Sequence, residues 1–364
     1  MTAALFSPLQ LRDITFANRI AVSPMAQYSA VKGVAQPWHL QHLGSLAVSG
    51  PGAVFIESTA VEPAGCGSKT CLALHTDAQE QGLRALIEAV RTFCATPFGL
   101  QLGHSGRKAS ACDPSEGRRP LYPEEGAWQT CAPSALSFSS EWPTPEALDA
   151  AGLQRVQQSF IQAAQRAAGL DIALLELHGA HGYLLHSFLS PISNRRTDAY
   201  GGNLANRMRF VLETFEKVRA VFPAGRLAGI RLNNTDWEEG GLSIEDTVQI
   251  VKGLQEVGCD YVCVSAGAIS SVSRVLAKPS YLVPFASRIR RETGIATFVT
   301  GMISTPDEAN RVISEGHADM VVIARAFLDD PRWAWHAAQQ LQVRVPYPMQ
   351  YQMSHPDAWK RGTA

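Results

Sequence analysis

The chain contains eight short hydrophobic runs that are rich in β-branched side chains and bounded by turn residues. Most of these runs are continuously apolar rather than alternating between apolar and polar positions, a pattern typical of strands buried on both faces in a parallel sheet. We predict strands over residues 20–23, 53–59, 98–103, 172–178, 227–233, 261–265, 296–300 and 320–324.

Segments with helical periodicity separate these runs. Ser243 and Asp246 form a capping box before one apolar stripe, and Gly258 follows its end. A second stripe begins after Thr305 and ends at Gly316. Eight strands that each lead into helical material predict a single (β/α)8 TIM barrel of the α/β class. A doubly wound sheet has the same alternation, but the number of strands and the polar residues at their ends favour the barrel.

No change in composition divides the chain, so we expect one barrel domain over residues 1–364. The longest insertion follows the third strand, over residues 105–146, and is rich in Pro, Gly and Trp. Loops of this length in a domain are usually functional, so we predict a lid-like segment. Residues 341–364 form a C-terminal tail.

Composition and charge indicate a folded protein and argue against some classes of partner. Hydrophobic residues make up 46% and charged residues 18%, which is enough apolar material for a folded core. The 32 basic and 33 acidic residues give a net charge of −1, so we expect no nucleic-acid or membrane partner. Without a signal peptide or a long apolar run, a cytoplasmic protein is expected. Seven cysteines without a CxxC pair predict free thiols.

The end of the fourth predicted strand carries the densest polar cluster. His178, His181 and Tyr183 lie within six residues, where a (β/α)8 barrel places its active site. Two imidazoles could hold and polarise a carbonyl oxygen while the phenol supplies a proton. With His186 the same imidazoles could instead bind a metal, although no carboxylate stands at a suitable ligand spacing. The residues alone leave open a proton-transfer site and a metal-dependent lyase or hydrolase.

Other strand ends suggest an anion-binding site. Arg231 is a cation in an apolar strand, which is costly unless it meets an anion or a core carboxylate. Gly301 and the Ala324-Arg325 pair follow the last two strands, where barrels commonly bind phosphate. Small residues let backbone N–H groups approach phosphate oxygens, and Arg325 could clamp them.

Several motifs occur in a specific order along nearly the whole chain. They are NRI at 18–20, SPMAQY at 23–28, HSGRKA at 104–109, HGAHGY at 178–183, RTDAYGG at 196–202 and ARA at 324–326. With these motifs the chain resembles the Old Yellow Enzyme family of FMN-dependent ene-reductases, and more closely its bacterial xenobiotic-reductase and thermophilic-like branch.

The resemblance implies noncovalent FMN, NADPH or NADH as reductant, and ping-pong reduction of enones, enals and nitro compounds. It also implies a homodimer or homotetramer. The residues that it assigns to FMN are Ser23, Pro24, Met25, Ala26, Ala60, Gln101, His178, Arg231, Gly301, Met302, Ala324 and Arg325. It assigns the substrate to Tyr28, His178, His181 and Tyr183, with Tyr183 as the proton donor. A flavin binder without catalysis is the alternative, and it would require both imidazoles and Tyr183 to be idle.

Three positions depart from the family's pattern. Ala26 stands where this branch typically carries Cys, so we expect a changed redox potential or substrate fit. Ser105 replaces the usual Ala after the third-strand His. Met353 occupies the place of an arginine that in relatives reaches a neighbouring subunit's active site.

Overall fold

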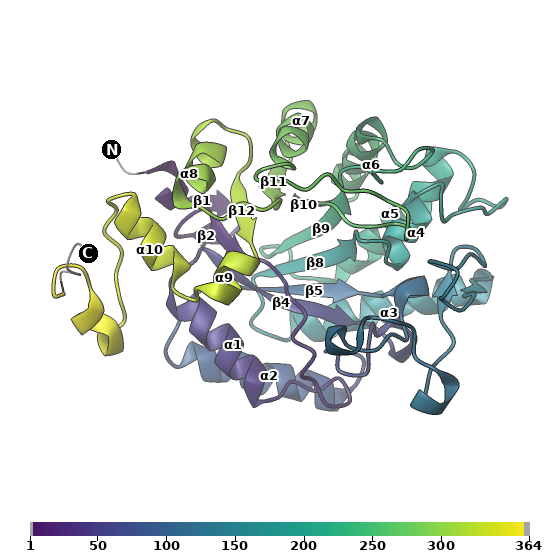
Figure 1. The fold of residues 1–364 in the computed structure, drawn as a ribbon, viewed down its shortest axis with the longest axis horizontal. Helices are drawn as coiled ribbons and strands as arrows, with labels where there is room; N and C mark the ends of the chain where they lie inside the picture. The colour runs from purple at the N-terminus through teal and green to yellow at the C-terminus, as the bar shows by residue number, and fades with distance from the viewer. Residues whose placement is uncertain (1–2, 360–364) are drawn as a thin grey trace.

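The computed structural model, which describes residues 3–359, contains a closed barrel of eight parallel strands in the order β10-β11-β12-β3-β4-β5-β8-β9 (Figure 1). Each predicted run corresponds to one barrel strand, with bounds that agree within two residues. The (β/α)8 prediction is therefore confirmed. The strands are β3 (Ile20–Val22), β4 (Ala53–Ala60), β5 (Phe98–Gly103), β8 (Leu174–Gly179), β9 (Leu227–Asn233), β10 (Tyr261–Ser265), β11 (Ala296–Val299) and β12 (Met320–Ile323).

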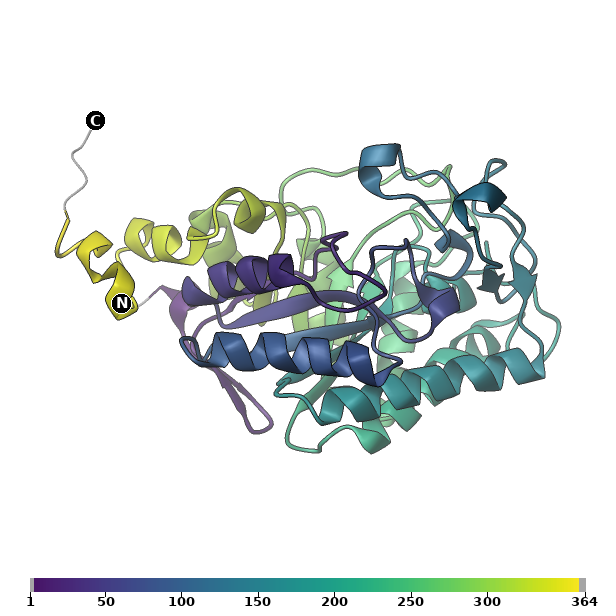
Figure 2. The same cartoon turned by 90° about the horizontal axis from the view of Figure 1, so that it is seen from below.

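Helices surround the barrel (Figures 1 and 2). The two predicted caps are present, because Ser243 Oγ accepts the Asp246 N–H at 3.1 Å and Thr305 Oγ1 accepts the Glu308 N–H at 3.4 Å. No helix within residues 3–359 has both the length and the apolar character needed to cross a bilayer. The helices are α1 (Pro37–Val48), α2 (Asp77–Arg91), α3 (Ala150–Ala168), α4 (Leu184–Leu189), α5 (Leu204–Val221), α6 (Ile244–Glu256), α7 (Val283–Thr293), α8 (Pro306–Ser314), α9 (Arg325–Asp329) and α10 (Trp333–Gln340).

The interior of the barrel is filled at the end where the strands begin. Leu174, Leu227 and Tyr261 are the first residues of their strands, and all three are buried in one apolar cluster. The hairpin of β1 (Leu9–Leu11) and β2 (Ile14–Phe16) packs against this cluster and buries Phe16 completely. The polar residues of the predicted site lie at the opposite end, where the strands finish.

The insertion between β5 and α3 has little regular structure. It contains the 3-10 helices η3 (Gly106–Lys108), η4 (Pro114–Glu116) and η5 (Pro123–Glu125) and the short paired strands β6 (Cys131–Ala132) and β7 (Glu146–Ala147). The buried Arg107 guanidinium ties this segment to the barrel, because it donates to the carbonyls of Leu136 and Ser137 and to that of Ile269 beyond β10. The insertion thus lies over the strand ends and contributes to the cavities there.

Candidate active site

Neighbouring strands bring the polar residues of the barrel mouth together. In the register of the sheet Gln101 on β5 is paired with Glu176 on β8, and His178 on β8 is paired with Arg231 on β9. Side chains two positions apart on a strand share one face, so Glu176 and His178 both point into the barrel. All four side chains are buried.

Two adjacent cavities open at this end of the barrel. The first has a volume of about 300 Å³, and we call it the tyrosine cavity; its lining includes Ala26, Tyr28, Ala60, Lys108, Arg118 and Tyr183. The second has a volume of about 380 Å³, and we call it the arginine cavity; its lining includes Ser23, His181, Arg231, Gly301, Met302, Ala324 and Arg325. The rings of His181 and Tyr183, one from each cavity, have centroids 6.4 Å apart.

His178, His181 and Tyr183 form a compact group between the cavities. The ring centroid of His178 lies 4.9 Å from that of His181 and 4.7 Å from that of Tyr183. The Ala180 N–H donates to His178 Nδ1 at 3.3 Å, so the proton of the neutral ring is on Nε2. Burial, reinforced by the Arg231 cation, holds the pKa of His178 well below its usual range. His178 is thus a neutral hydrogen-bond donor.

The protein around Tyr183 keeps its phenol protonated. Burial raises the pKa of Tyr183 to about 12, with a smaller contribution from Cys71. A phenol with this pKa retains its proton throughout the physiological range. His181 is likewise neutral, because burial and then Arg231 lower its pKa well below the usual range.

The turn after β8 is held by residues from other strands. His181 adopts a left-handed backbone conformation with φ 61°, and its N–H donates to Asn233 Oδ1 at 3.1 Å. His181 Nε2 lies 2.8 Å from Ser265 Oγ. His186 does not join the other two imidazoles, since its Nδ1 accepts the Gly182 N–H and its Nε2 lies 2.8 Å from Asp236. The structure therefore does not form the three-histidine metal arrangement considered above.

Arg231 has an unused donor beside the arginine cavity. Its two terminal nitrogens donate to Ser23 Oγ and Ser265 Oγ, each at 3.1 Å, while its buried Nε has no partner. Within residues 3–359 no carboxylate lies within 4 Å of this guanidinium, so the alternative of a salt bridge to a core carboxylate is not formed. A buried cation with a free donor fits the electronegative edge of a flavin ring.

The far end of the arginine cavity fits a phosphate. Gly301 has φ +117°, and a Cβ added there would lie 2.9 Å from the Cβ of Leu282, so the position requires glycine. Arg325 is exposed at the cavity and, among residues 3–359, has no carboxylate within 4 Å. The residues present are therefore compatible with FMN, with its phosphate near Gly301 and Arg325.

Four of the expected flavin residues, Pro24, Met25, Gln101 and His178, do not line either cavity. Pro24 and Met25 connect Ser23 of the arginine cavity to Ala26 of the tyrosine cavity along the chain. The Nε2 amide of Gln101 donates to Glu176 Oε1 at 2.7 Å, which fixes the orientation of the amide. Burial raises the pKa of Glu176 to about 7, and Arg231 opposes this shift.

Glu57 supports the segment that carries Ala26 and Tyr28. The Gln27 N–H donates to Glu57 Oε2 at 2.9 Å, and His39 Nε2 lies 3.2 Å from Glu57 Oε1. Strand β4 has an irregular register immediately after Glu57, between residues 56 and 59, and bulges of this kind re-aim side chains near active sites. Tyr28 itself has φ 50°.

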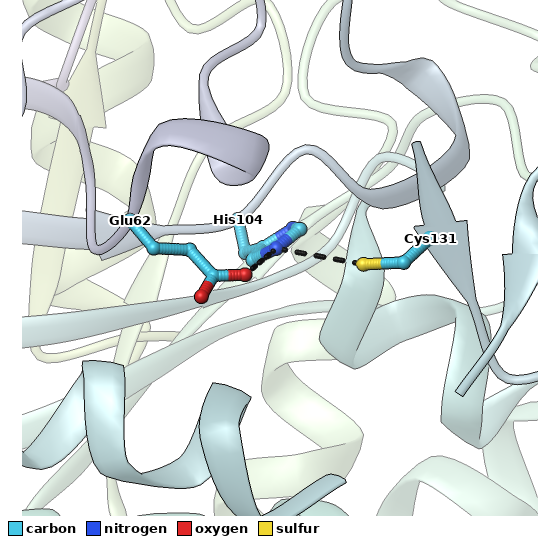
Figure 3. Close-up of side chains that lie close together, drawn as sticks. All are labelled: Glu62, His104 and Cys131. Carbon is cyan, nitrogen blue, oxygen red and sulfur yellow. Dashed lines mark hydrogen bonds and ion pairs between the residues drawn. The ribbon is translucent and has the colours of Figure 1, made fainter. Parts of the chain in front are cut away.

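A second buried cluster contains Glu62, His104 and Cys131 (Figure 3), whose ligand-type atoms lie within 4.8 Å of one another. The Gly106 N–H donates to His104 Nδ1 at 3.0 Å, so His104 Nε2 carries the proton directed at Glu62 Oε1, 2.9 Å away. Burial opposes ionisation of Glu62, but His104 and Arg155 outweigh it and lower its pKa to about 2. Because the ion pair with Arg155 already neutralises the carboxylate, we interpret the cluster as a complete polar network.

The departures from the family's pattern occupy two different places. Ala26 and Ser105 both line the tyrosine cavity, so each changes the surface that a substrate meets. Met353 lies in the 3-10 helix η6 (Met349–Ser354) and is 83% exposed. It lines neither of the two cavities at the barrel mouth.

The fold and the two cavities define a class of protein: a (β/α)8 barrel whose mouth has room for a phosphate-bearing ligand in one cavity, beside a second cavity that a phenol lines, with two neutral imidazoles between them. The sequence profile of the NADH:flavin oxidoreductase / NADH oxidase family matches residues 4–344. The chain belongs to this family, that of the Old Yellow Enzyme.

Relatives and solved structures agree with this assignment. The chain is 37% identical to an NADPH dehydrogenase of Geobacillus thermodenitrificans over 97% of this chain and 98% of that protein. It is 36% identical to an NADPH dehydrogenase of Bacillus subtilis over 97% and 99% of the two chains. Among solved structures, morphinone reductase is similar with a TM-score of 0.78, 26% identity and coverage of 95% and 91%.

The protein is therefore an Old Yellow Enzyme-type oxidoreductase that uses FMN and a nicotinamide reductant. The predicted family, cofactor and enzyme class are confirmed. The roles assigned to individual residues stay predictions.

Proposed function

We propose that the enzyme reduces the activated C=C bonds of enones, enals and nitro compounds, with NADPH or NADH as reductant in ping-pong order. The observation that carries this proposal is the contact group of His178, His181 and Tyr183 beside a cavity of about 300 Å³. A neutral imidazole donor and a protonated phenol in one site suit the addition of hydride and proton across a polarised double bond. We also propose that the enzyme is a homodimer or homotetramer.

FMN, when bound, supplies the hydride chemistry in both halves of the reaction. His178 Nε2–H donates to the carbonyl or nitro oxygen of the substrate and stabilises the negative charge that develops there, and His181 assists from the other cavity. Tyr28 and Tyr183 flank the substrate, and the Tyr183 hydroxyl gives its proton to the α-carbon. Ser23, Arg231 and Arg325 hold the cofactor at the barrel mouth.

The visible spectrum of the purified protein tests this proposal. Under anaerobic conditions we expect flavin absorption bands that bleach when NADPH is added and return when 2-cyclohexenone follows. Bands that bleach but do not return with enones, enals or nitroalkenes would contradict alkene reduction while leaving the flavin oxidoreductase assignment intact. A reduced enzyme that dioxygen reoxidises but that none of these alkenes reoxidises would likewise contradict alkene reduction and leave the flavin oxidoreductase assignment intact.

Lys108 predicts a pH dependence of substrate reduction. Its Nζ donates to the His181 carbonyl at 2.8 Å and lies 5.5 Å from the ring centroid of Tyr183. Burial, followed by the Arg107 and Arg118 cations, lowers the pKa of Lys108 to about 8, so the charged form predominates below that pH. Because the cation favours negative charge developing on the substrate, we expect the rate to fall about three- to tenfold as pH rises through 8.

The measurement is single-turnover reduction of 2-cyclohexenone by the reduced enzyme between pH 6 and 10. In Lys108→Met the rate should be low and should not change around pH 8. Lys252→Met removes an exposed lysine from α6 and serves as the matched control, with the wild-type profile expected. A step near pH 8 that persists in Lys108→Met would show that another group titrates.

A further inference from the structure

The tyrosine cavity contains two cations and no carboxylate. Lys108 and Arg118 line it, and none of its lining residues is Asp or Glu. Across residues 3–359, neither cation has a carboxylate within 4 Å; Lys108 donates to two backbone carbonyls and Arg118 to the Tyr28 hydroxyl. Uncompensated positive charge inside a cavity attracts anions and raises their local concentration.

Arg118 is held in place at this cavity. Its Nη2 donates to Tyr28 Oη at 2.7 Å, a contact between residues 90 positions apart. Both residues have left-handed backbone conformations, with φ 54° for Arg118 and φ 50° for Tyr28. Such conformations are unfavourable for bulky side chains, and those that occur cluster at ligand sites.

The neighbouring arginine of the same loop, Arg119, differs from Arg118 in its hydrogen-bond partners. Arg119 pairs with Glu125 through two hydrogen bonds of 2.7 Å, so both of its terminal nitrogens are engaged by the protein. Arg118 donates through a single terminal nitrogen, to the Tyr28 hydroxyl, and it is exposed, so its other donors are accessible to a ligand. A guanidinium fork of this kind matches the two oxygens of a carboxylate.

The remaining wall of the cavity is aromatic. Phe138 and Trp142 from the insertion line it and meet edge to face, with ring centroids 5.6 Å apart. Lys108 Nζ lies 4.5 Å from the centroid of Phe138. The cavity thus pairs apolar rings, suited to a carbocyclic body, with cations suited to an anionic substituent.

We infer that the substrates include activated alkenes that carry a carboxylate which is not conjugated with the reacting double bond, and that Arg118 binds this carboxylate. This inference rests on the proposed function and names the substrate class of the same cavity. Arg118 determines specificity and takes no part in hydride or proton transfer. The charge on the substrate is matched by the guanidinium, while the alkene and its activating oxygen lie toward His178.

A matched pair of substrates tests the inference: 4-oxocyclohex-2-ene-1-carboxylate and its methyl ester. We expect kcat/KM of the wild-type enzyme to be at least about tenfold higher for the carboxylate. Arg118→Gln should lower kcat/KM for the carboxylate about ten- to a hundredfold more than it lowers that for the ester, so the carboxylate-over-ester ratio is the readout. Arg118→Lys, which keeps the charge, should recover part of the preference. Arg195→Gln removes an exposed arginine that does not line the cavity and should behave like wild type.

Binding provides a readout that needs no turnover. The saturated compound 4-oxocyclohexane-1-carboxylate cannot be reduced at C=C, and its Kd on the oxidised holoenzyme can be measured by calorimetry. It should bind more tightly than its methyl ester, with a preference that is reduced by Arg118→Gln and by added salt.

The outcomes separate the two proposals. An enzyme that reduces 2-cyclohexenone but shows no carboxylate preference, with Arg118→Gln unchanged, would overturn the inference and leave the proposed function standing. An Arg118→Gln variant slowed only in its reduction by NADPH would assign the cation to the phosphates of the nicotinamide cofactor and also overturn it. An enzyme that reduces none of the three alkenes would remove the proposed function and the inference together.

Discussion

Replacing Tyr183 with Phe is expected to slow reduction of 2-cyclohexenone by the reduced enzyme about 10²- to 10⁴-fold, which is the usual contribution of a positioned general acid. Reduction of the enzyme by NADPH should keep its rate, because that half of the reaction needs no proton from this phenol. The substitution removes one oxygen and retains the ring that contacts His178. The packing of the site is therefore preserved while the proton donor is lost.

Stopped-flow absorbance under anaerobic conditions measures the two halves separately. The wild-type enzyme should show a solvent deuterium isotope effect on alkene reduction that changes in Tyr183→Phe, where water must supply the proton. Tyr122→Phe removes a hydroxyl from a tyrosine that is 51% exposed in the insertion, and it should leave both rates unchanged. If Tyr183→Phe slowed reduction by NADPH and alkene reduction equally, the result would indicate a disturbed cavity and would contradict the proton-donor role of Tyr183.

The fold could be predicted from local patterns because each strand carries its own signal. A continuously apolar run such as 320–324 is typical of a strand buried on both faces, and the observed strand, Met320–Ile323, is buried at every position. The Ser243 cap is equally local, since donor and acceptor lie three residues apart. Eight such runs leave few topologies other than the barrel.

The catalytic group could be predicted for a related reason. His178, His181 and Tyr183 lie within one strand end, so a short stretch of sequence already places them together. Their protonation could not be predicted, because it depends on burial and on Arg231 from the neighbouring strand. The interaction of His186 could not be predicted either, because its partner Asp236 comes from a different loop.

The sequence patterns did not predict interactions between residues that are far apart in sequence. Glu57, Glu62 and Glu176 are buried, and each interacts with a group far away in sequence, as Glu62 does with Arg155 across 93 residues. The contact between Arg118 and Tyr28 is of the same kind. A signal was nevertheless present, since Glu57 and Glu176 stand in apolar strands, where a carboxylate is costly unless it has a partner.

Replacing His178 with Ala is expected to lower the rate of 2-cyclohexenone reduction about 10²- to 10³-fold, the cost typical of losing one oxyanion donor. Because burial and Arg231 keep the pKa of His178 well below its usual range, the ring is neutral and its Nε2–H remains available from pH 8 down to pH 6. The ratio of wild-type to variant rates should therefore stay constant over this interval. A cationic imidazole would instead make the ratio rise as the pH falls.

His178 is 3% exposed, so its removal also leaves a cavity, and a loss of folding must be separated from a loss of the donor. His178→Asn restores a side-chain N–H and should recover part of the rate, whereas a purely structural role predicts similar rates for the Asn and Ala variants. Flavin content and thermal unfolding of both variants check that the barrel is intact. His317→Ala, at an imidazole on the surface near α8, should leave the rate unchanged. A His178→Ala enzyme that retains wild-type kcat/KM for the enone would remove this imidazole from the mechanism.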